Sequence, residues 1–374
     1  MKKKSKKQIL RSVLNCLYLC PYSRLQRVKK NPDVMINKSV KTKVAFICDE
    51  MTWIDYSGYV TSVFLHPKTW KEQLTDLAPD VLFCESAWCG IDKYLNCWRG
   101  RVYKDKRLFF ENRKVLLEIL SYCKEKNIKT VFWNKEDPIF FQHQIYDFTD
   151  TALHFDYIFT TAIECIDKYY KLGHKNVYLL PFGVNTNLFN TVSRNYKPKT
   201  VIFAGSWFSD QSKRCADLEA ILDYVIAKGW KLDIYDRKSE CKGNRFRFPS
   251  KYKRYIRQAV PYSSIPELCK KYEFAINVNT VTESETMFSR RLLQMIMCGI
   301  TVISNYSVAF SKYTSYFSYS FVADNIVSIS GNINEIGNDF STELQMRKLL
   351  ESIEPKEYLI NVEKSCEKAT LISP

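Results

Sequence analysis

The feature that most limits the possible fold is a repeated alternation of short apolar runs with longer segments of helical periodicity. In the first half of the chain, segments 70–77 and 107–126 carry apolar residues at helical spacing. The apolar runs of strand length around them cover 43–48, 80–85, 129–134, 154–160 and 176–180. This alternation is typical of parallel strands joined by crossover helices. The first half therefore predicts an α/β domain.

The same pattern starts again after a polar segment that contains Pro198. Strands are expected over 200–206, 231–235, 273–278 and 300–304, with helices over 215–228 and 265–271. A chain of 374 residues is long enough for two such domains. Two parallel sheets joined in this way turn their carboxyl ends toward a shared crevice, which is where α/β proteins bind ligands.

These patterns divide the chain into five parts. The expected parts are a basic tail (1–43), a first α/β domain (44–190), a linker (191–199), a second α/β domain (200–340) and C-terminal helices (341–374). We expect the C-terminal helices to pack back on the first domain.

The positive charge of the chain is concentrated at its beginning. The net charge is +16, and residues 1–43 account for +12, with thirteen Lys or Arg and one acid. Residues 44–374 therefore carry only +4, which argues against a nucleic-acid partner because such a protein needs a basic face on its folded part.

The tail predicts contact with a membrane surface. Leu10, Val13, Leu14 and Leu17 fall on one helical face behind a run of lysines. The apolar run is too short to span a bilayer and has no cleavage site of a signal peptide. A basic amphipathic helix suits an anionic membrane surface, here through residues 1–30; a solvated helix packed on the body is the alternative. The thirteen scattered cysteines favour a reducing compartment, so we expect a cytoplasmic protein, peripheral on the inner face of the cell membrane.

Two arginines open the most apolar helix of the second half. Ser289, Arg290 and Arg291 precede a run of Leu, Met and Ile that ends at Gly299. The helix dipole disfavours cations in the first turn unless an anion lies there, and helix starts with arginine hold phosphates well. Two arginines that only solvate a helix end are the alternative. Gln294, on the same helix, is a candidate for a ribose contact.

A second group of phosphate-binding candidates follows the strand at 200–206. Gly205 and Ser206 form a small-residue turn that lets a ligand approach the backbone. Lys213 and Arg214 come at the start of the next helix and could neutralise a diphosphate without metal, although a solvated pair is equally expected. We expect no metal and no cofactor, since no histidine pair has ligand spacing and no Asp-x-Asp stands at a strand end.

Acidic residues follow three strands of the first half, and these are the candidates for acid–base chemistry. Asp49 and Glu50 follow the run 43–48, Glu85 ends the run 80–85, and Glu136 and Asp137 come shortly after the run 129–134; the candidates are Glu85, Glu136 and Asp137. At the carboxyl edge of a parallel sheet, such a group could deprotonate or orient an acceptor hydroxyl. The alternative is that these acids cap the helices that follow.

Several longer motifs resemble the CgeB-like (spore maturation protein) glycosyltransferases. The motifs run in order from about residue 44 to about residue 305: 85–88, 132–138, 155–161, 180–183, 203–206, and 286–291 with 298–299. The resemblance implies a GT-B fold of two Rossmann-like domains, with a nucleotide-sugar donor on the second and an acceptor on the first. It also implies a role in surface polysaccharide or glycoconjugate assembly.

One departure concerns the donor helix. The broader glycogen-synthase-like superfamily has two glutamates eight positions apart, where this chain has Thr286 and Gln294. The resemblance therefore leaves the retaining mechanism, and activity itself, open. The same superfamily places a polar residue after the strand that ends at Asn134, which favours Glu136 or Asp137 as the group nearest the sugar.

The sequence thus predicts a metal-independent hexosyltransferase that moves a sugar from a nucleotide-sugar to a glycan, glycolipid or other lipid-linked acceptor. Arg290, as a diphosphate ligand, should be essential for transfer but not for folding. Two alternatives remain: a polyol-phosphate transferase of the teichoic-acid type, and an inactive GT-B protein that binds glycans or acts as a scaffold.

Overall fold

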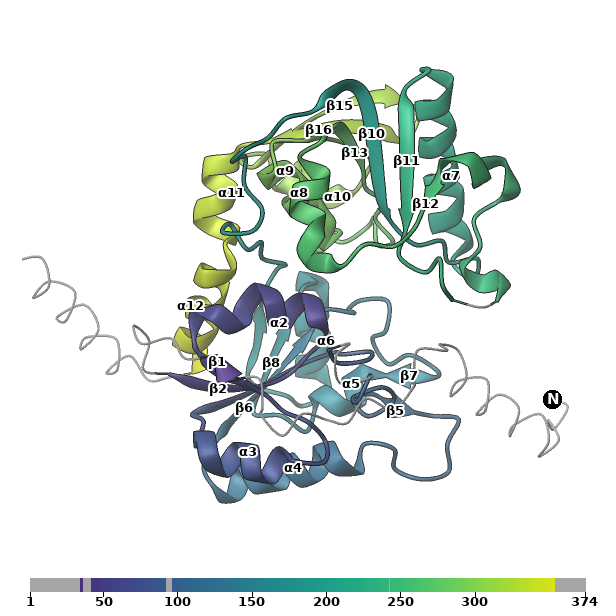
Figure 1. The fold of residues 1–374 in the computed structure, drawn as a ribbon. Helices are drawn as coiled ribbons and strands as arrows, with labels where there is room; N and C mark the ends of the chain where they lie inside the picture. The colour runs from purple at the N-terminus through teal and green to yellow at the C-terminus, as the bar shows by residue number, and fades with distance from the viewer. Residues whose placement is uncertain (1–33, 36–41, 92–95, 242, 354–374) are drawn as a thin grey trace, which may run out of the picture.

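The computed structural model describes residues 34–353 apart from 36–41, 92–95 and 242. Its chain forms two α/β domains, one above the other in Figure 1, each built on a seven-stranded sheet. The predicted basic tail lies almost entirely outside the described residues. Val34–Met35, at its end, forms a short strand (β1) that pairs antiparallel with β3 of the first domain.

The sheet of the first domain has the strand order β1-β3-β2-β4-β6-β8-β9, and all its pairings except β1–β3 are parallel. Its inner strands are almost wholly buried because helices cover both faces. The parallel strands are β2 (Lys43–Ile47), β3 (Thr61–Phe64), β4 (Val81–Glu85), β6 (Lys129–Asn134), β8 (Tyr157–Thr160) and β9 (Val177–Leu179).

The sheet of the second domain has the order β12-β11-β10-β13-β14-β16-β15. Five of its strands are parallel, and an antiparallel hairpin of β15 and β16 completes one edge. The strands are β10 (Lys197–Gly205), β11 (Lys231–Asp236), β12 (Ile256–Arg257), β13 (Tyr272–Ile276), β14 (Thr301–Asn305), β15 (Phe317–Ala323) and β16 (Ile326–Gly331).

Helices connect these strands. Those of the first domain are α2 (Glu50–Tyr56), α3 (Trp70–Leu77), α4 (Lys114–Glu125), α5 (Phe148–Ala152) and α6 (Ile166–Lys171). Those of the second are α7 (Ser212–Ala227), α8 (Ile265–Cys269), α9 (Arg290–Met297), α10 (Val308–Lys312) and α11 (Ile333–Phe340). Helix α2 lies at the top of the first domain, facing the second (Figure 1).

The chain crosses between the domains twice, and the crossings touch. Val184 N–H donates to Phe340 O at 2.8 Å, and Thr342 N–H donates back to Val184 O at 3.0 Å. After this crossing, helix α12 (Thr342–Ile353) packs against the first domain, where Met346 and Leu349 join the core. The predicted return of the C-terminal helix to the first domain is confirmed, as is the GT-B arrangement of two Rossmann-like domains. The rest of the predicted C-terminal helices lies outside the described residues.

Several elements differ from the expectation. Strands β3 and β12, the hairpin of β15 and β16, and helices α2, α5, α10 and α11 were not expected, and the helix expected from residue 107 begins only at Lys114. The seven preceding residues include a loop with two exposed phenylalanines, so apolar spacing over 107–113 reflects a surface feature rather than a helix.

Candidate active site

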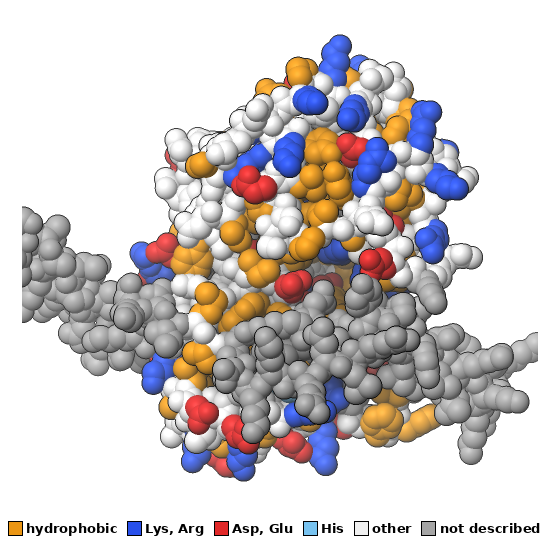
Figure 2. Space-filling model, in the orientation of Figure 1, with side chains coloured by type: hydrophobic (Ala, Val, Ile, Leu, Met, Phe, Trp, Pro, Cys, Tyr) orange, Lys and Arg blue, Asp and Glu red, His pale blue; other side chains and the backbone are white. Residues whose placement is uncertain are grey.

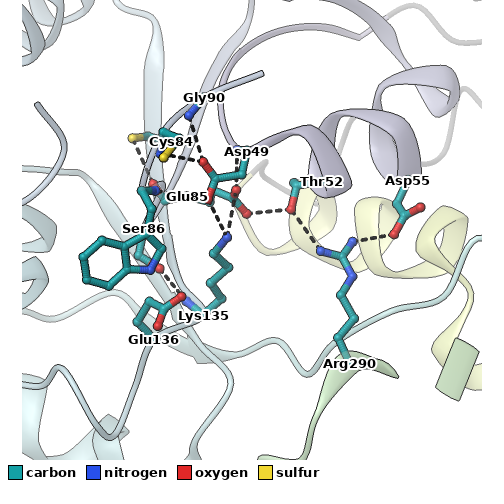
Figure 3. Close-up of polar contacts among 12 residues, drawn as sticks. Asp49, Thr52, Asp55, Cys84, Glu85, Ser86, Gly90, Lys135, Glu136 and Arg290 are labelled. Atoms are coloured by element: carbon teal, nitrogen blue, oxygen red, sulfur yellow. Dashed lines mark hydrogen bonds and ion pairs between the residues drawn. The ribbon is translucent and has the colours of Figure 1, made fainter. Parts of the chain in front are cut away.

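A buried ionic cluster closes the carboxyl end of the first sheet (Figure 3). Lys135 Nζ lies 3.1 Å from Asp49 Oδ2 and 3.1 Å from Glu85 Oε1. Asp49 also accepts hydrogen bonds from the backbone N–H groups of Trp88, Cys89 and Gly90. Burial works to raise the pKa of Asp49, but Lys135 and these N–H groups lower it overall. The cluster therefore holds the strand ends together as fixed charges.

Glu85, a predicted catalytic residue, belongs to this structural cluster. Its side chain has no exposed surface, and Oε1 accepts the Asp49 N–H at 2.5 Å as well as Lys135. Its other oxygen accepts the Thr52 hydroxyl at 2.6 Å. A carboxylate with both oxygens occupied and no access to solvent cannot reach a substrate hydroxyl.

Asp137, the second candidate, is also fully buried. It accepts hydrogen bonds from Asn134 at 2.8 Å, Thr160 at 2.8 Å and Tyr169 at 3.1 Å. Burial raises its pKa to about 7, with the Thr160 and Tyr169 hydrogen bonds acting in the opposite direction. This network joins β6, β8 and α6, so the structure places Asp137 inside the domain rather than at a reaction centre.

Glu136 is the candidate acid that retains access to solvent, since it is half-buried. The Trp88 side chain hydrogen-bonds its carboxylate. Burial raises the pKa of Glu136; Lys135 and Trp88 oppose the shift, while the negative charges of Asp49 and Glu85 add to it. A reachable carboxylate with a raised pKa is the chemistry expected of a general base.

Arg290 spans the two domains instead of facing an open donor site. Its guanidinium donates to Asp55 Oδ2 at 2.7 Å and to Thr52 Oγ1 at 3.1 Å, both on α2 (Figure 3). Asp55 is fully buried and Arg290 is 8% exposed. The expectation that Arg290 is dispensable for folding is therefore not supported, because its positive charge is neutralised by the first domain.

Gln294 belongs to the same contact. Its side-chain amide donates to the Tyr262 hydroxyl at 2.6 Å, and Tyr262 donates to Asp55. With 2% of its surface exposed, Gln294 is not open to a ribose. Thr286, at the other diagnostic position, accepts from Ile163 N–H and donates to Thr161 O, each at 2.9 Å. Both positions that depart from the superfamily pattern therefore hold the domains together.

We expect Asp55→Ala to destabilise the protein by about 3–5 kcal/mol, because it leaves the Arg290 guanidinium buried without its partner. Chemical unfolding monitored by circular dichroism measures the change. Arg347→Ala, which breaks an exposed pair with Glu343 on α12, is the matched control and should cost at most about 1 kcal/mol. Asp55→Leu with Arg290→Met should cost less than Asp55→Ala alone. Equal effects of Asp55→Ala and the control would contradict a buried interdomain pair.

Three arginines of the second domain gather around the carboxyl ends of β10 and β11. Arg214 on α7 donates to Ser206 O at 3.1 Å, and the Arg237 N–H donates to Gly205 O at 2.9 Å. The Arg291 guanidinium, on α9, lies 5.4 Å from the centre of the Phe203 ring. Within the described part of the chain, none of the three forms an ion pair.

The three guanidiniums repel one another. Burial, Arg237 and Arg214 lower the pKa of Arg291 to about 9, and burial together with Arg237 lowers that of Arg214 to about 10. The pKa of Arg237, whose side chain is partly exposed, is also lowered by desolvation, whereas Asp49, Asp236 and Glu136 act in the opposite direction. The negative charges of Asp49 and Glu136, which belong to the first domain, thus act on Arg237 of the second domain. Such a cluster attracts an anion.

The remaining predicted donor residues have specific places near this cluster. The space beside Gly205 is filled by Phe203: an added Cβ would lie 2.5 Å from the ring. Ser206 is buried, and its hydroxyl has no partner among the described residues. Lys213 is exposed, with Nζ 2.9 Å from Thr282 Oγ1 and 3.6 Å from Glu283. Ser289 begins α9, and its N–H donates to Asn279 Oδ1 at 2.8 Å.

A cavity of about 560 Å³ lies where the two domains meet. Pro138 and Ile163 contribute from the first domain, and Val281 and Ser284 from the second; the remaining lining residues are acidic, namely Glu164, Asp167, Glu283 and Glu285. Pro138 lies two residues after Glu136 in the chain, but Glu136 itself does not line the cavity. Among the described residues, no group of three or more His, Cys, Asp or Glu side chains could hold a metal ion.

Arg237 is the site residue that sequence reasoning missed. It directly follows the strand β11, as the acids of the first half follow their strands. The same strand-end argument, applied to cations in the second half, would have found it.

Comparison with known proteins gives weak structural similarities. No family model and no curated protein sequence matches the chain. One similar structure is an α-glucosyltransferase in complex with UDP and a 13-mer DNA containing a HMU base, with 12% identity and a TM-score of 0.45 over 88% of this chain and 94% of that one. A pneumococcal O-GlcNAc transferase in complex with UDP and GlcNAc shares 11% identity and a TM-score of 0.31 over 70% of this chain and 61% of that one. The resemblance to the CgeB-like family stays an expectation.

Proposed function

We propose that the chain is a glycosyltransferase that uses a nucleotide-sugar donor. The observation that supports this proposal is the group formed by Arg214, Arg237 and Arg291, which make no ion pair among the described residues, together with the half-buried Glu136 of the other domain, whose charge acts on Arg237. Positive charge at the strand ends of one domain suits a diphosphate leaving group, and a carboxylate with a raised pKa across the gap suits activation of an acceptor hydroxyl.

In the proposed reaction, the acceptor lies between the domains with its hydroxyl against Glu136. The carboxylate takes the proton as the acceptor oxygen bonds to the anomeric carbon. The bond between that carbon and the diphosphate oxygen breaks, and its electron pair stays on the leaving nucleoside diphosphate. Arg214, Arg237 and Arg291 stabilise the negative charge that develops there. Ser206, whose buried hydroxyl lacks a partner among the described residues, is a further candidate for a phosphate contact.

The second part of the proposal concerns the class of acceptor. We propose a glycan or lipid-linked acceptor at the cytoplasmic face of a membrane, with residues 1–30 holding the enzyme on the anionic surface. The hydroxyls of a sugar suit the four carboxylates around the interdomain cavity, since carboxylates accept hydrogen bonds from hydroxyl groups. No described helix is long and apolar enough to cross a membrane.

A panel of nucleoside diphosphates tests the donor site. We expect at least one to raise the melting temperature of the full chain, and to do so equally with EDTA, because the arginines replace a metal at the phosphates. Arg291→Ala should weaken binding of that compound about 10- to 100-fold, as expected for a lost charged hydrogen bond. Absence of any shift across the panel, with transfer also undetectable, would favour the inactive scaffold.

A further inference from the structure

An exposed aromatic tip projects from the first domain between β5 (Lys104–Asp105) and α4. The Phe109 side chain is 97% exposed and Phe110 is 68% exposed, while Leu108 beside them is half-buried. In Figure 1 this segment projects at the lower right edge of the first domain. Figure 2 shows hydrophobic side chains at that edge, close to lysine and arginine side chains. Exposed large apolar groups side by side are unfavourable in water and mark interaction surfaces.

Hydrogen bonds and ion pairs of Asn112 and Arg113 hold the end of this segment in place. Asn112 accepts the Asp105 N–H at 3.0 Å and donates to the backbone carbonyls of Gly100 at 2.8 Å and Tyr103 at 2.7 Å. On the C-terminal side, the buried Arg113 side chain pairs with Glu111 at 2.8 Å and Asp150 at 2.7 Å. These bonds fix the backbone that follows the two rings.

The tip lies in a basic segment of the folded body. Residues 99–114 contain seven Lys or Arg and two acids, a net charge of +5, whereas residues 44–374 together carry only +4. Both acids of the segment are paired within it, Asp105 with Arg107 and Glu111 with Arg113. The exposed cations of this segment are Arg99, Arg101, Lys106, Arg107 and Lys114, of which Lys106 pairs with Asp147 and Arg107 with Asp105.

An anionic bilayer fits this combination better than a nucleic acid does. The side chains of Leu108, Phe109 and Phe110 have no hydrogen-bonding group, so binding is favoured by their removal from water. The hydrocarbon boundary of a membrane offers the apolar surroundings for this. The amide that could read a base, that of Asn112, is used by the backbone of the segment itself. Cations around an inserted apolar tip match the negative headgroups of anionic lipids.

We propose that Leu108, Phe109 and Phe110 insert into the surface of an anionic membrane, with the exposed cations of the segment on the lipid headgroups. This contact is separate from the one proposed for residues 1–30. It would hold the first domain itself against the bilayer.

Vesicle sedimentation of the full chain tests the proposal without a donor or acceptor, so its outcome is independent of the proposed activity. With vesicles of phosphatidylcholine and phosphatidylglycerol, Phe109→Ser with Phe110→Ser should lower the partition coefficient at least tenfold. Phe109→Leu with Phe110→Leu should keep it near the wild-type value, because apolar character is retained. The matched control is Phe321→Ser with Val322→Ser, a consecutive exposed pair on β15 of the second domain, which should change it less than twofold.

Three outcomes would overturn the proposal. The first is a double serine variant that binds these vesicles within twofold of the wild type. The second is an equal loss in the control on β15. The third is unchanged vesicle binding with weakened binding of a duplex oligonucleotide, which would assign the tip to nucleic acid. A melting temperature within a few degrees of the wild type confirms that each variant is folded, as expected for rings that are already exposed.

Discussion

Replacing Arg237 with alanine should slow sugar transfer by about 10²–10³-fold, the usual cost of removing one preorganised group that stabilises developing negative charge. Arg237 directly follows β11, and in the proposed reaction its charge stabilises the leaving diphosphate. The effect is measured as the rate of sugar transfer from a nucleotide-sugar that carries the nucleoside diphosphate identified in the panel. The loss should appear in kcat and kcat/KM alike, because the charge develops only in the transition state.

The matched control is Arg254→Ala, an exposed arginine of the same domain in the 3-10 segment before β12. It should leave transfer within twofold of the wild type and so exclude a general effect of lost surface charge. Since Arg237 makes no ion pair among the described residues, Arg237→Ala should also leave the melting temperature nearly unchanged. Full activity of Arg237→Ala would remove this residue from the leaving-group site.

Glu136→Gln should lower kcat by about 10²–10⁴-fold while donor binding stays within a few fold, because the amide keeps the size of the side chain but cannot accept the proton. The pH dependence gives a second readout. Burial raises the pKa of Glu136 above its ordinary value, and only the carboxylate form is the base. In the wild type, kcat should therefore rise with pH through that raised pKa, and this rise should be absent in Glu136→Gln.

Glu125→Gln, at the exposed end of α4, is the matched control and should retain both the rate and the pH profile. Asp137→Asn gives a different contrast. Asp137 is fully buried in a network with Thr160 and Tyr169, so its replacement should lower stability before it alters the pH profile. A rise of kcat with pH that persists in Glu136→Gln and disappears in Asp137→Asn would identify Asp137, and not Glu136, as the general base.

The sequence predicted the architecture well because strand and helix periodicities are local signals. Strands β4 and β6 and helix α3 lie where the apolar runs placed them. Strand β3 was not predicted because Thr61–Phe64 is only four residues long and follows the 3-10 turn Ser57–Tyr59 after a single residue. The hairpin of β15 and β16 was not predicted because its outer strand is mostly exposed and so lacks the continuous apolar run of a buried parallel strand.

The site was harder to predict because side-chain partners come from distant parts of the chain. Glu85 and Arg290 were reasonable candidates from their positions, yet Lys135 neutralises the first and Asp55 neutralises the second. Neither pairing can be predicted from the local sequence, because Lys135 lies 50 residues from Glu85 and Arg290 lies 235 residues from Asp55. Arg214 and Arg291 were predicted from their positions at helix starts, and the structure brings both together with Arg237.

The most direct test of the account is a crystal structure of the full chain with the nucleoside diphosphate that gives the largest thermal shift. The account predicts phosphate oxygens within hydrogen-bonding distance, about 2.7–3.2 Å, of the guanidinium nitrogens of Arg237 and Arg291, with Glu136 facing them across the gap. Phosphates bound elsewhere, with these arginines turned to solvent, would contradict it.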